Sequence, residues 1–342
     1  MTPAFSIFVD GGDITGKLQD RLIRIQLIEY DGHESDSLEI VLDDRDFAVE
    51  APSSDAPLSL SLGYRETGLV FKGLFMVDEV EVDGPPFTMK IHAKAADQLS
   101  AQKQHRTLAY QNKTLGAIVQ QIAGRYGLTP GISSDLSSVQ YDYVNQTEES
   151  DWHFLTRLAK ENDALFSIKN GHLIFVSRAS NTSMSGLAMP KVIVTYPGNL
   201  IRYRAMAKDR PRHKKSKAAY HDLTTGQVVI EDADGSDGSA EFMVRHLQPN
   251  KTQAKNSAQA KQNSLDRAQG EVNVEIEGDP SVTPQGIMLC QTGRTILDGE
   301  WEIKQVTNNL ENGSGFRTWI AGGAKPSKPN KHYAKPTRVQ RF

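Results

Sequence analysis

The sequence predicts a mainly β protein in which a small α/β domain separates two β-rich domains. Three observations support this fold class. Residues 4 to about 96 alternate apolar and polar side chains in repeated short runs, which is typical of strands with one buried and one wet face. A helix followed by a hairpin is predicted within residues 150–176, and strand-like patterns return between residues 192 and 321.

The first β-rich stretch contains short predicted strands joined by turns. One strand covers Phe5 to Val9, and another runs from Leu69 to Val77 past Gly73, which indicates a bulge. The turn Asp83-Gly84-Pro85-Pro86 separates the last two strands. Repeated strands with short turns predict a sandwich or small barrel. The alternating apolar positions are Ile23, Ile25, Leu27, Leu38, Ile40, Leu42, Leu58, Leu60, Leu62, Val80, Val82, Phe87, Met89 and Ile91.

Two helices open the α/β domain. Thr114 is the predicted N-cap of the first helix, and Gly127 takes the left-handed position after its end. A polar loop is expected from Gly131 to Glu149. Ser150 is the N-cap of the second helix, and Asn162-Asp163 ends it. The apolar faces are Leu115, Ile118, Val119, Ile122 and Tyr126 in the first helix, and Trp152, Phe154, Leu155, Leu158 and Ala159 in the second.

A hairpin completes this domain. Its strands are predicted from Ala164 to Ile168 and from Leu173 to Val176. The residues between them are Lys169-Asn170-Gly171-His172, and Asn-Gly is the strongest two-residue hairpin signal because both central positions require a positive φ. The whole stretch from Ser150 to Val176 is interpreted as a packed module without a reactive group.

The second β-rich stretch is predicted from strand signals around one polar helix. A hairpin loop is expected at 222–226, before a strand from Gln227 to Ile230, and a polar loop from Glu231 to Ala240. The helix covers Thr252 to Ala268, and its thin apolar stripe of Ala254, Ala258 and Leu265 suits a helix on a barrel or at a subunit contact. The remaining strands are Val192 to Tyr196, Leu200 to Ala207, Val272 to Ile276, Gly286 to Cys290, Trp301 to Val306 and Phe316 to Ala321.

The composition is that of a soluble protein with two or three domains. Its 342 residues are 38% hydrophobic and 24% charged, and no run approaches the ~18 apolar residues of a membrane-spanning helix. The N-terminus lacks the features of a signal peptide. Because Cys290 is the single cysteine, no internal disulfide can form and folding in a reducing cytoplasm is expected. Its apolar neighbours predict a buried strand cysteine rather than a nucleophile.

The charge is unevenly distributed. Residues 1–100 carry 19 acidic and 8 basic side chains, a net charge of −11, whereas the whole chain has a net charge of −3. An acidic first domain and a basic remainder would give a polar field useful for head-to-tail assembly, and uneven solvated surfaces explain the same numbers equally well.

A search for chemistry assigns no catalytic, cofactor-binding or metal-binding residue, and we expect a protein that is not an enzyme. The nine histidines have no zinc-binding spacing, and no nucleophile elbow, phosphate loop or dinucleotide-binding motif is found. The run Asp43-Asp44-Arg45-Asp46 is interpreted as a solvated turn. The stretch from Asp232 to Asp237 fails as a calcium loop, because Asp237 and Met243 occupy the glycine and glutamate positions. A pair of carboxylates for glycoside hydrolysis stays an open alternative, since that chemistry needs only two acids at a suitable separation.

Two basic segments are candidates for contacts with a partner. The first has thin aromatic interleaving and no recognition helix, so a solvated loop or an acidic protein neighbour is favoured over direct DNA contact. The second, residues 324–342, contains three prolines and no acid, and such a tail is either disordered or laid along a partner. The basic residues are Arg202, Arg204, Lys208, Arg210, Arg212, Lys214, Lys215 and Lys217 in the first, and Lys325, Lys328, Lys331, Lys335, Arg338 and Arg341 in the second.

Several ordered stretches resemble the phage late control D protein family, the tail hub proteins of contractile phages. The family signature is matched by SDWHFLTRLAKENDALFSIKNGHLIF, and the helix before it by KTLGAIVQQIAGRYGL. The first barrel of the family is matched by LSLSLGYRETGLVFKGLFMVDEVEVDGPP, and the end of its second barrel by GDPSVTPQGIMLC and WEIKQVTNNLENGSGFRTWIAGG. The resemblance covers most of residues 1–325. Two positions depart from it: His153 replaces an acidic capping-box residue, and Asn308 stands where the family often has histidine.

The resemblance implies two tube-type β-barrel domains, at 1–98 and 186–323, flanking the α/β domain at 99–185 and followed by the basic tail at 324–342. Three such chains would form a ring whose barrels adapt a sixfold tail tube to a threefold central spike. Type VI secretion spike proteins (VgrG) share this hub but continue into a needle, so a separate spike protein is implied here. The expected partners are two further copies, the tail tube protein and the spike, with the tape measure protein and other baseplate proteins as further candidates.

The expected location is the tail tip or baseplate of the virion, after assembly in the host bacterial cytoplasm. No cofactor and no membrane anchor are implied, and DNA would meet the hub only in transit through the lumen. Two other functions stay open: a hub that also cleaves peptidoglycan, and a DNA-handling protein that uses the basic cluster at 202–217.

Overall fold

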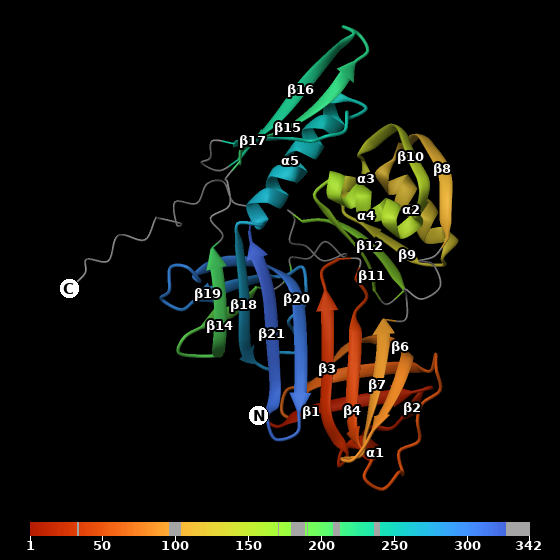
Figure 1. Cartoon of the computed structure of the whole chain (residues 1–342), viewed down its shortest axis with the longest axis vertical. Coiled ribbons are helices and arrows are strands. Elements are labelled where there is room, and N and C mark those ends of the chain that lie inside the picture. The colour runs from red at the N-terminus through yellow and green to blue at the C-terminus, as the bar shows by residue number, and fades with distance from the viewer. Residues whose placement is uncertain are drawn as a thin grey trace, which may run out of the picture.

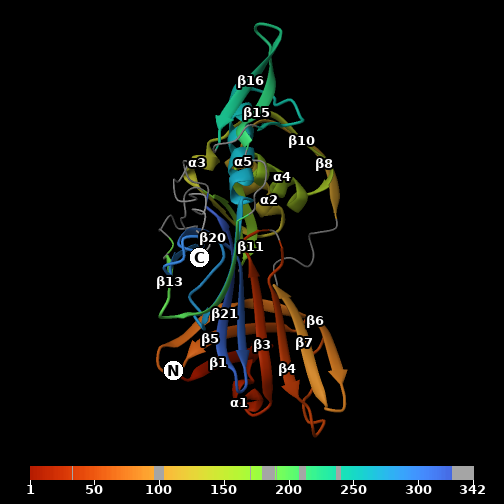
Figure 2. The same cartoon turned by 60° about the vertical axis from the view of Figure 1, so that its left-hand side comes forward.

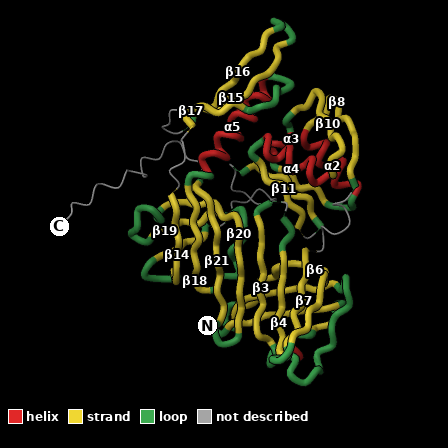
Figure 3. The backbone as a smooth tube through the Cα atoms, viewed as in Figure 1, coloured by secondary structure: helices red, strands yellow, loops and turns green. Residues whose placement is uncertain are grey.

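The computed structural model describes residues 1–32, 34–95, 104–169, 171–178, 189, 191–207, 213–235 and 240–325. Strands make up one end of the molecule, and the three long helices lie toward the other end (Figures 1 and 3). The prediction of a mainly β protein is confirmed.

The first β region follows the predicted alternation. Its core contains the inward-facing residues of each strand, such as Ile25, Ile40 and Ile91. Ile40 is 1% exposed and opposes Ile91 across the ladder between two neighbouring strands. Another ladder shifts register opposite Gly73, which confirms the predicted bulge. The elements are β1 (Pro3–Val9), β2 (Gly12–Asp13), α1 (Thr15–Leu18), β3 (Leu22–Tyr30), β4 (Ser37–Asp43), β5 (Pro57–Tyr64), β6 (Gly68–Asp83) and β7 (Thr88–Ala95).

The α/β segment is built on the predicted caps. The Thr114 hydroxyl accepts a hydrogen bond from the Ala117 amide at 3.1 Å, and the Ser150 hydroxyl accepts one from the His153 amide at 3.2 Å. Gly127 has a φ of +67°, as its position after the helix requires. The elements are β8 (His105–Thr114), α2 (Leu115–Arg125), β9 (Thr129–Ile132), α3 (Ser134–Ser137), β10 (Gln140–Ser150), α4 (Asp151–Glu161), β11 (Ala164–Lys169) and β12 (His172–Ser177).

The apolar faces predicted for the two helices form one core with the hairpin. The predicted residues of α4 are all buried, and Phe154 stacks on Tyr110 with a ring separation of 5.3 Å. The hairpin pairs Lys169 with His172, so the loop has the two predicted residues, and Gly171 has a φ of +76°. Asn170 lies outside the described residues.

The second β region contains the predicted strands, most of them longer than expected, and the predicted helix. The Asn250 side chain caps this helix by accepting a hydrogen bond from the Gln253 amide at 3.0 Å. The elements are β13 (Val192–Thr195), β14 (Leu200–Ala207), β15 (His213–Asp222), β16 (Gln227–Asp234), β17 (Ala240–Met243), α5 (Lys251–Arg267), β18 (Gly270–Glu277), β19 (Ile287–Gln291), β20 (Gly299–Glu311) and β21 (Gly315–Ala324).

Both β regions belong to one hydrogen-bonded sheet. Its strand order is β14-β18-β21-β20-β3-β4-β7-β6-β5-β1-β2, and β3 and β20 pair from Tyr30 opposite Gln305 to Arg24 opposite Glu311. Leu310 and Phe316 of the second region are buried in the core of the first. The two regions are therefore joined by backbone bonds and by shared core residues. The predicted domain boundaries at 98, 185 and 323 stay predictions.

Two predicted loops are wrong. Residues 131–149 contain most of β10, which forms because this segment pairs with β8. The strand was not predicted because it is polar and buries only a few side chains, among them Tyr141 and Val144. Residues 231–234 continue β16, where Asp232 and Asp234 lie beside Lys215 of the neighbouring strand. In both segments, backbone pairing with a neighbouring strand stabilises a strand that the polar sequence did not predict.

The helix α5 lies beside the small sheet β16-β15-β17 and near α4 (Figure 1). Ala254 and Ala258 contact Ala218 and Ala233 in a small alanine cluster, whereas Leu265 is only partly buried. The hairpin formed by β15 and β16 projects beyond the rest of the described chain in both views (Figures 1 and 2). A narrow stripe of alanines permits this close approach of helix and strands.

Candidate functional site

A buried ion pair lies where the two β regions meet. Glu29 follows Ile25 and Leu27 on the inward face of β3, so the alternation of the strand turns its carboxylate toward the interior. Lys72 lies at the bulge of β6. Its Nζ is 2.8 Å from Oε2 of Glu29, and the two side chains are only 2% and 8% exposed.

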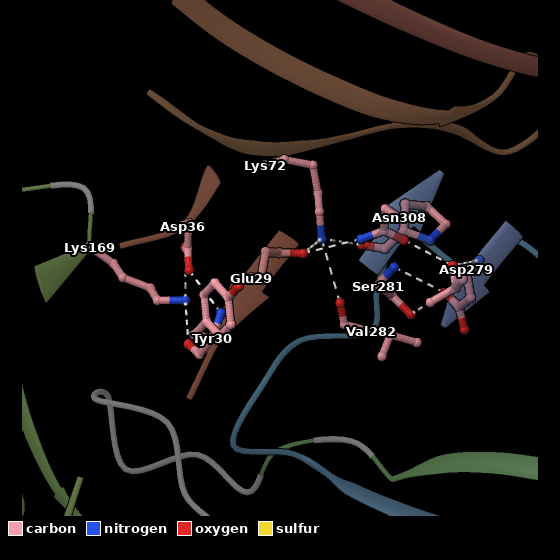
Figure 4. Close-up of polar contacts among 11 residues, drawn as sticks. Glu29, Tyr30, Asp36, Lys72, Lys169, Asp279, Ser281, Val282 and Asn308 are labelled. Atoms are coloured by element: carbon pink, nitrogen blue, oxygen red, sulfur yellow. Dashed lines mark hydrogen bonds and ion pairs between the residues drawn. The ribbon is translucent and has the colours of Figure 1, made fainter. Parts of the chain in front are cut away.

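The second β region completes this polar group. Asn308 of β20 is fully buried, and its Nδ2 donates to Oε2 of Glu29 at 3.1 Å. The Thr318 hydroxyl of β21 donates to Oδ1 of Asn308 at 2.9 Å. Lys72 also donates to the Pro280 carbonyl at 3.1 Å. We call Glu29, Lys72, Asn308 and Thr318 the sheet junction; Figure 4 labels the first three.

The buried charges of the sheet junction are stabilised only when Glu29 and Lys72 are both present and paired. Burial raises the pKa of Glu29, and the ammonium group of Lys72 opposes this rise. Removing two charges from water costs several kcal/mol per ion, and close pairing with added hydrogen bonds offsets that cost. The sheet junction therefore favours one arrangement of the two β regions, the one in which every partner is present.

The α/β segment is attached next to this group. Lys169, at the end of β11, places its Nζ 3.0 Å from Oδ2 of Asp36 and donates to the Tyr30 carbonyl at 3.3 Å (Figure 4). Asp36 also accepts a hydrogen bond from the Tyr30 amide at 2.9 Å. One lysine thus links the hairpin of the α/β segment to the end of β3.

A second charged group joins the α/β segment to the second β region. Arg267, at the end of α5, contacts Asp163 through both terminal nitrogens at 2.6 and 2.9 Å. Its Nε donates to Glu302 of β20 at 2.9 Å. Burial raises the pKa of the Glu302 carboxyl, and Arg267 opposes the rise. We call Asp163, Arg267 and Glu302 the helix junction.

A cleft of about 320 Å³ lies beside the sheet junction. Its lining includes Lys72 and Lys169 with their acidic partners, together with Val70, Phe71 and Leu74 of β6. The loop from Pro280 to Gln285 contributes to the wall formed by the second β region. The cleft is thus lined by paired charges and by exposed apolar side chains.

The residues that the sequence singled out for chemistry lie elsewhere. Cys290 is buried in β19, which confirms the prediction, and burial raises the pKa of its thiol to about 12. The acidic run at 43–46 forms a turn, but Asp44 is buried rather than solvated, and its carboxylate accepts a hydrogen bond from the Val49 amide. Asp232 pairs with Lys215, and Asp237 lies outside the described residues.

The basic cluster at 202–217 is spread over two strands rather than one loop. Arg202 on β14 pairs with Glu275, and on β15 Lys215 and Lys217 pair with Asp232 and Glu241. Residues 208–212 lie outside the described part of the chain, as does the tail from residue 326. The predicted roles of both basic segments stay predictions.

The sequence reasoning missed the members of both junctions. A signal was present for Glu29, because a charged residue on the apolar face of an alternating strand needs a buried partner. Asn308 was noted only as a departure from the family pattern. Nothing local pointed to Lys72 as the partner of Glu29, because the ladder order brings the two strands together.

The described carboxylates at the junctions are paired with cations, including Glu29, which lines the cleft beside the sheet junction. Glu29 is paired with Lys72, and Asp163 and Glu302 are paired with Arg267. Within the described ranges, no group of three or more histidine, cysteine or acidic side chains could hold a metal ion. Among the same residues no helix is long and apolar enough to span a bilayer. The arrangement is suited to fixing segments of the chain relative to one another.

Comparisons with known proteins agree with this arrangement of elements. The "43 kDa tail protein" of prophage MuSo2 from Shewanella oneidensis has a similar fold, with a TM-score of 0.70 and 15% identity over 95% of this chain and 99% of that chain. A type VI secretion component of Escherichia coli, described as similar to the T4 tail proteins gp27 and gp5, has a TM-score of 0.53 and 11% identity over 90% of this chain and 76% of that one.

Sequence comparison gives a closer relation. The chain is 30% identical to the "Probable baseplate hub protein" of Escherichia phage 186, over 94% of this chain and 92% of that protein. It is also 30% identical to the protein of the same description from Escherichia phage P2, over 93% of this chain and 92% of that protein. The family model described as "Phage tail baseplate hub (GPD)" matches residues 37–308. The chain therefore belongs to the phage tail baseplate hub family.

Proposed function

We propose that this protein is the structural hub of a contractile tail, in which three copies form a ring that joins the sixfold tail tube to the threefold central spike. The observation that carries the proposal is the single sheet that passes from one β region to the other through β3 and β20. A hub of this kind has to hold its two β regions in one fixed orientation while the tail transmits force.

The two junctions support a mechanical role rather than a catalytic one. The sheet junction is buried at the β3–β20 ladder, which contains Glu29 and Asn308, and the helix junction links α5 and the α/β segment to β20. Peptidoglycan hydrolysis would need two carboxylates on opposite sides of a substrate cleft. The acidic residues of the junctions face lysine or arginine, so the geometry favours a hub without this activity.

The proposed setting is the tail tip of the virion, after assembly in the host cytoplasm. The proposed partners are two further copies of the chain, the tail tube protein and a separate spike protein, with the tape measure protein and other baseplate proteins as additional candidates. DNA would pass through the lumen without a dedicated binding site.

Native mass spectrometry of the purified full chain tests the proposal. We expect a trimer of the 37.8 kDa chain, and we expect immobilised tube protein and immobilised spike protein each to capture it. A chain that stays monomeric and is captured by neither protein would contradict the hub. Clearing of purified cell wall by the chain, abolished by one Asp or Glu substitution, would favour the hydrolase instead.

A further inference from the structure

Two apolar surfaces stay exposed in the part of the chain that the structure describes. One lies on the N-terminal half of β6, next to the cleft, and the other lies on the β15–β16 hairpin, which projects at one end of the molecule (Figures 1 and 2). Among the described strands, β16 is an edge strand, and the N-terminal half of β6 pairs on one side only. Exposed apolar strand edges are normally covered, because they otherwise promote aggregation.

The first surface, the β6 edge, consists of Leu69, Phe71 and Leu74. These residues are opposite Gly63, Ser61 and Ser59 across the β5–β6 ladder, so they share one face of the sheet. Their side chains are 42%, 55% and 50% exposed. Pairing with β7 begins only at Phe75, and no described strand pairs with the other side of residues 68–74.

The surroundings of the β6 edge require an uncharged occupant. The adjacent cleft contains two acidic and two basic side chains, and each acid is already paired with a lysine: Glu29 with Lys72, and Asp36 with Lys169. A charged group that entered the cleft would disturb one of these pairs and would lose its own hydration. An extended apolar strand can instead bond to the open strand edge and cover Phe71.

The second surface, the hairpin tip, consists of Leu223, Val228 and Ile230. Their exposed fractions are 88%, 58% and 52%. Val228 and Ile230 lie on the face of β16 opposite to Ala233, which is buried against α5. The stretch from Leu223 to Ile230 contains no ionisable side chain, and the outer edge of β16 has no described partner.

We propose that the hairpin tip of one copy docks on the β6 edge of a second copy, with β16 adding a strand beside β6. The two surfaces differ and lie apart on one chain, which is the requirement for a head-to-tail contact that repeats around a ring. None of the six residues that define the two surfaces is charged, so their contact buries apolar side chains rather than ions. The contact rests on the ring of the proposed function and names the surfaces that close it.

Mixing two complementary variants tests the contact. Phe71→Asp disables the β6 edge, and Val228→Asp disables the hairpin tip. We expect each variant alone to be monomeric in native mass spectrometry, with self-association weakened at least tenfold. Their mixture should form a heterodimer, in which the intact tip of Phe71→Asp docks on the intact edge of Val228→Asp. The heterodimer should not grow further, because the tip and edge left unused are the two disabled ones. Val82→Asp is the matched control on the distal part of β6, where Val82 is 67% exposed, and it should leave the trimer intact.

Each result decides one question. Trimers formed by both single variants would overturn the contact and leave the hub proposal intact, whereas a monomeric wild-type chain at every concentration would overturn both. Single variants that fail to form a heterodimer, although circular dichroism shows that they are folded, would also overturn it. If either variant unfolds, Leu74→Asp and Ile230→Asp replace the pair and are held to the same outcomes.

Discussion

The sheet junction and the helix junction use the same chemistry in different surroundings. At the sheet junction, Glu29 and Lys72 lie beside a continuous backbone ladder between β3 and β20. At the helix junction, no described ladder connects β11 to β20, and Arg267 provides the link from α5 to Asp163 and Glu302. Side chains adjust an existing connection in the first case and provide the connection in the second.

This difference separates two effects of buried charge. In a sheet that is already paired, an ion pair selects one register and orientation, and its loss lowers stability without detaching a segment. Where no ladder is present, an ion pair acts together with other side-chain contacts, such as those of Lys169, to keep a segment attached. Substitutions at the two junctions should therefore differ in where the molecule opens as well as in how much stability they remove.

The largest loss is expected for Lys72→Met. It leaves the Glu29 carboxylate buried without its cation, and it should lower the free energy of unfolding by about 3–5 kcal/mol in denaturant titrations. The pKa of Glu29 is already raised by burial, so the folded state binds a proton more tightly than the unfolded state. The variant should therefore lose stability as the pH rises above 4.5, the ordinary value for this group.

The double variant Glu29→Gln with Lys72→Met is the control for this effect. It removes both charges and keeps an acceptor for Asn308, so most of the lost stability should return. A double variant that is no more stable than Lys72→Met would contradict the account of the sheet junction.

A smaller but more local effect is expected for Arg267→Met. It removes charge-assisted hydrogen bonds to Asp163 and Glu302 and should cost about 1.5–3 kcal/mol. Hydrogen exchange should accelerate in α5 and β11 while the amides of β3 and β20 stay protected. The control Arg202→Met removes a pair whose arginine side chain is 75% exposed, and it should change little. Equal acceleration in β3 would show that the two junctions are not separate.

A smaller loss of stability is expected at Thr318, which contacts Asn308 but not the ion pair of the sheet junction. Thr318→Val removes the hydroxyl that donates to Asn308 and accepts from the Asp279 amide, with little change in volume. The expected loss is about 1 kcal/mol in thermal or denaturant unfolding. A loss as large as that of Lys72→Met would mean that the hydrogen bonds, rather than the charge pair, dominate the sheet junction.

The smallest effect is expected at an exposed pair outside both junctions. The hydrogen bond from Arg21 lowers the pKa of Asp46 to about 2. A carboxylate with a lowered pKa stabilises the fold above its ordinary value of 3.8, and this contribution is lost as the pH falls toward 2. The small difference between wild type and Arg21→Met should therefore be present at pH 7 and shrink by about pH 3. A difference that grows on acidification would refute this assignment.

Local signals in the sequence identified much of the secondary structure. The caps at Thr114 and Ser150, the left-handed glycines at 127 and 171, and the bulge at Gly73 act within a few residues of themselves. The core faces of α2 and α4 follow in the same way from helical spacing. Such features can be predicted because the chemistry that causes them lies within one turn of the chain.

The tertiary structure alone decided three further features. The polar strand β10 exists because β8 pairs with it, and α5 is held by alanine contacts and by Arg267 rather than by a wide apolar stripe. Glu29, Lys72 and Asn308 meet only because the ladder order places β3, β6 and β20 around one point. Side-chain type and local spacing predict most strands and helices. The polar strand β10 depends on its partner strand, and the pairing of distant charges depends on how the whole sheet closes around them.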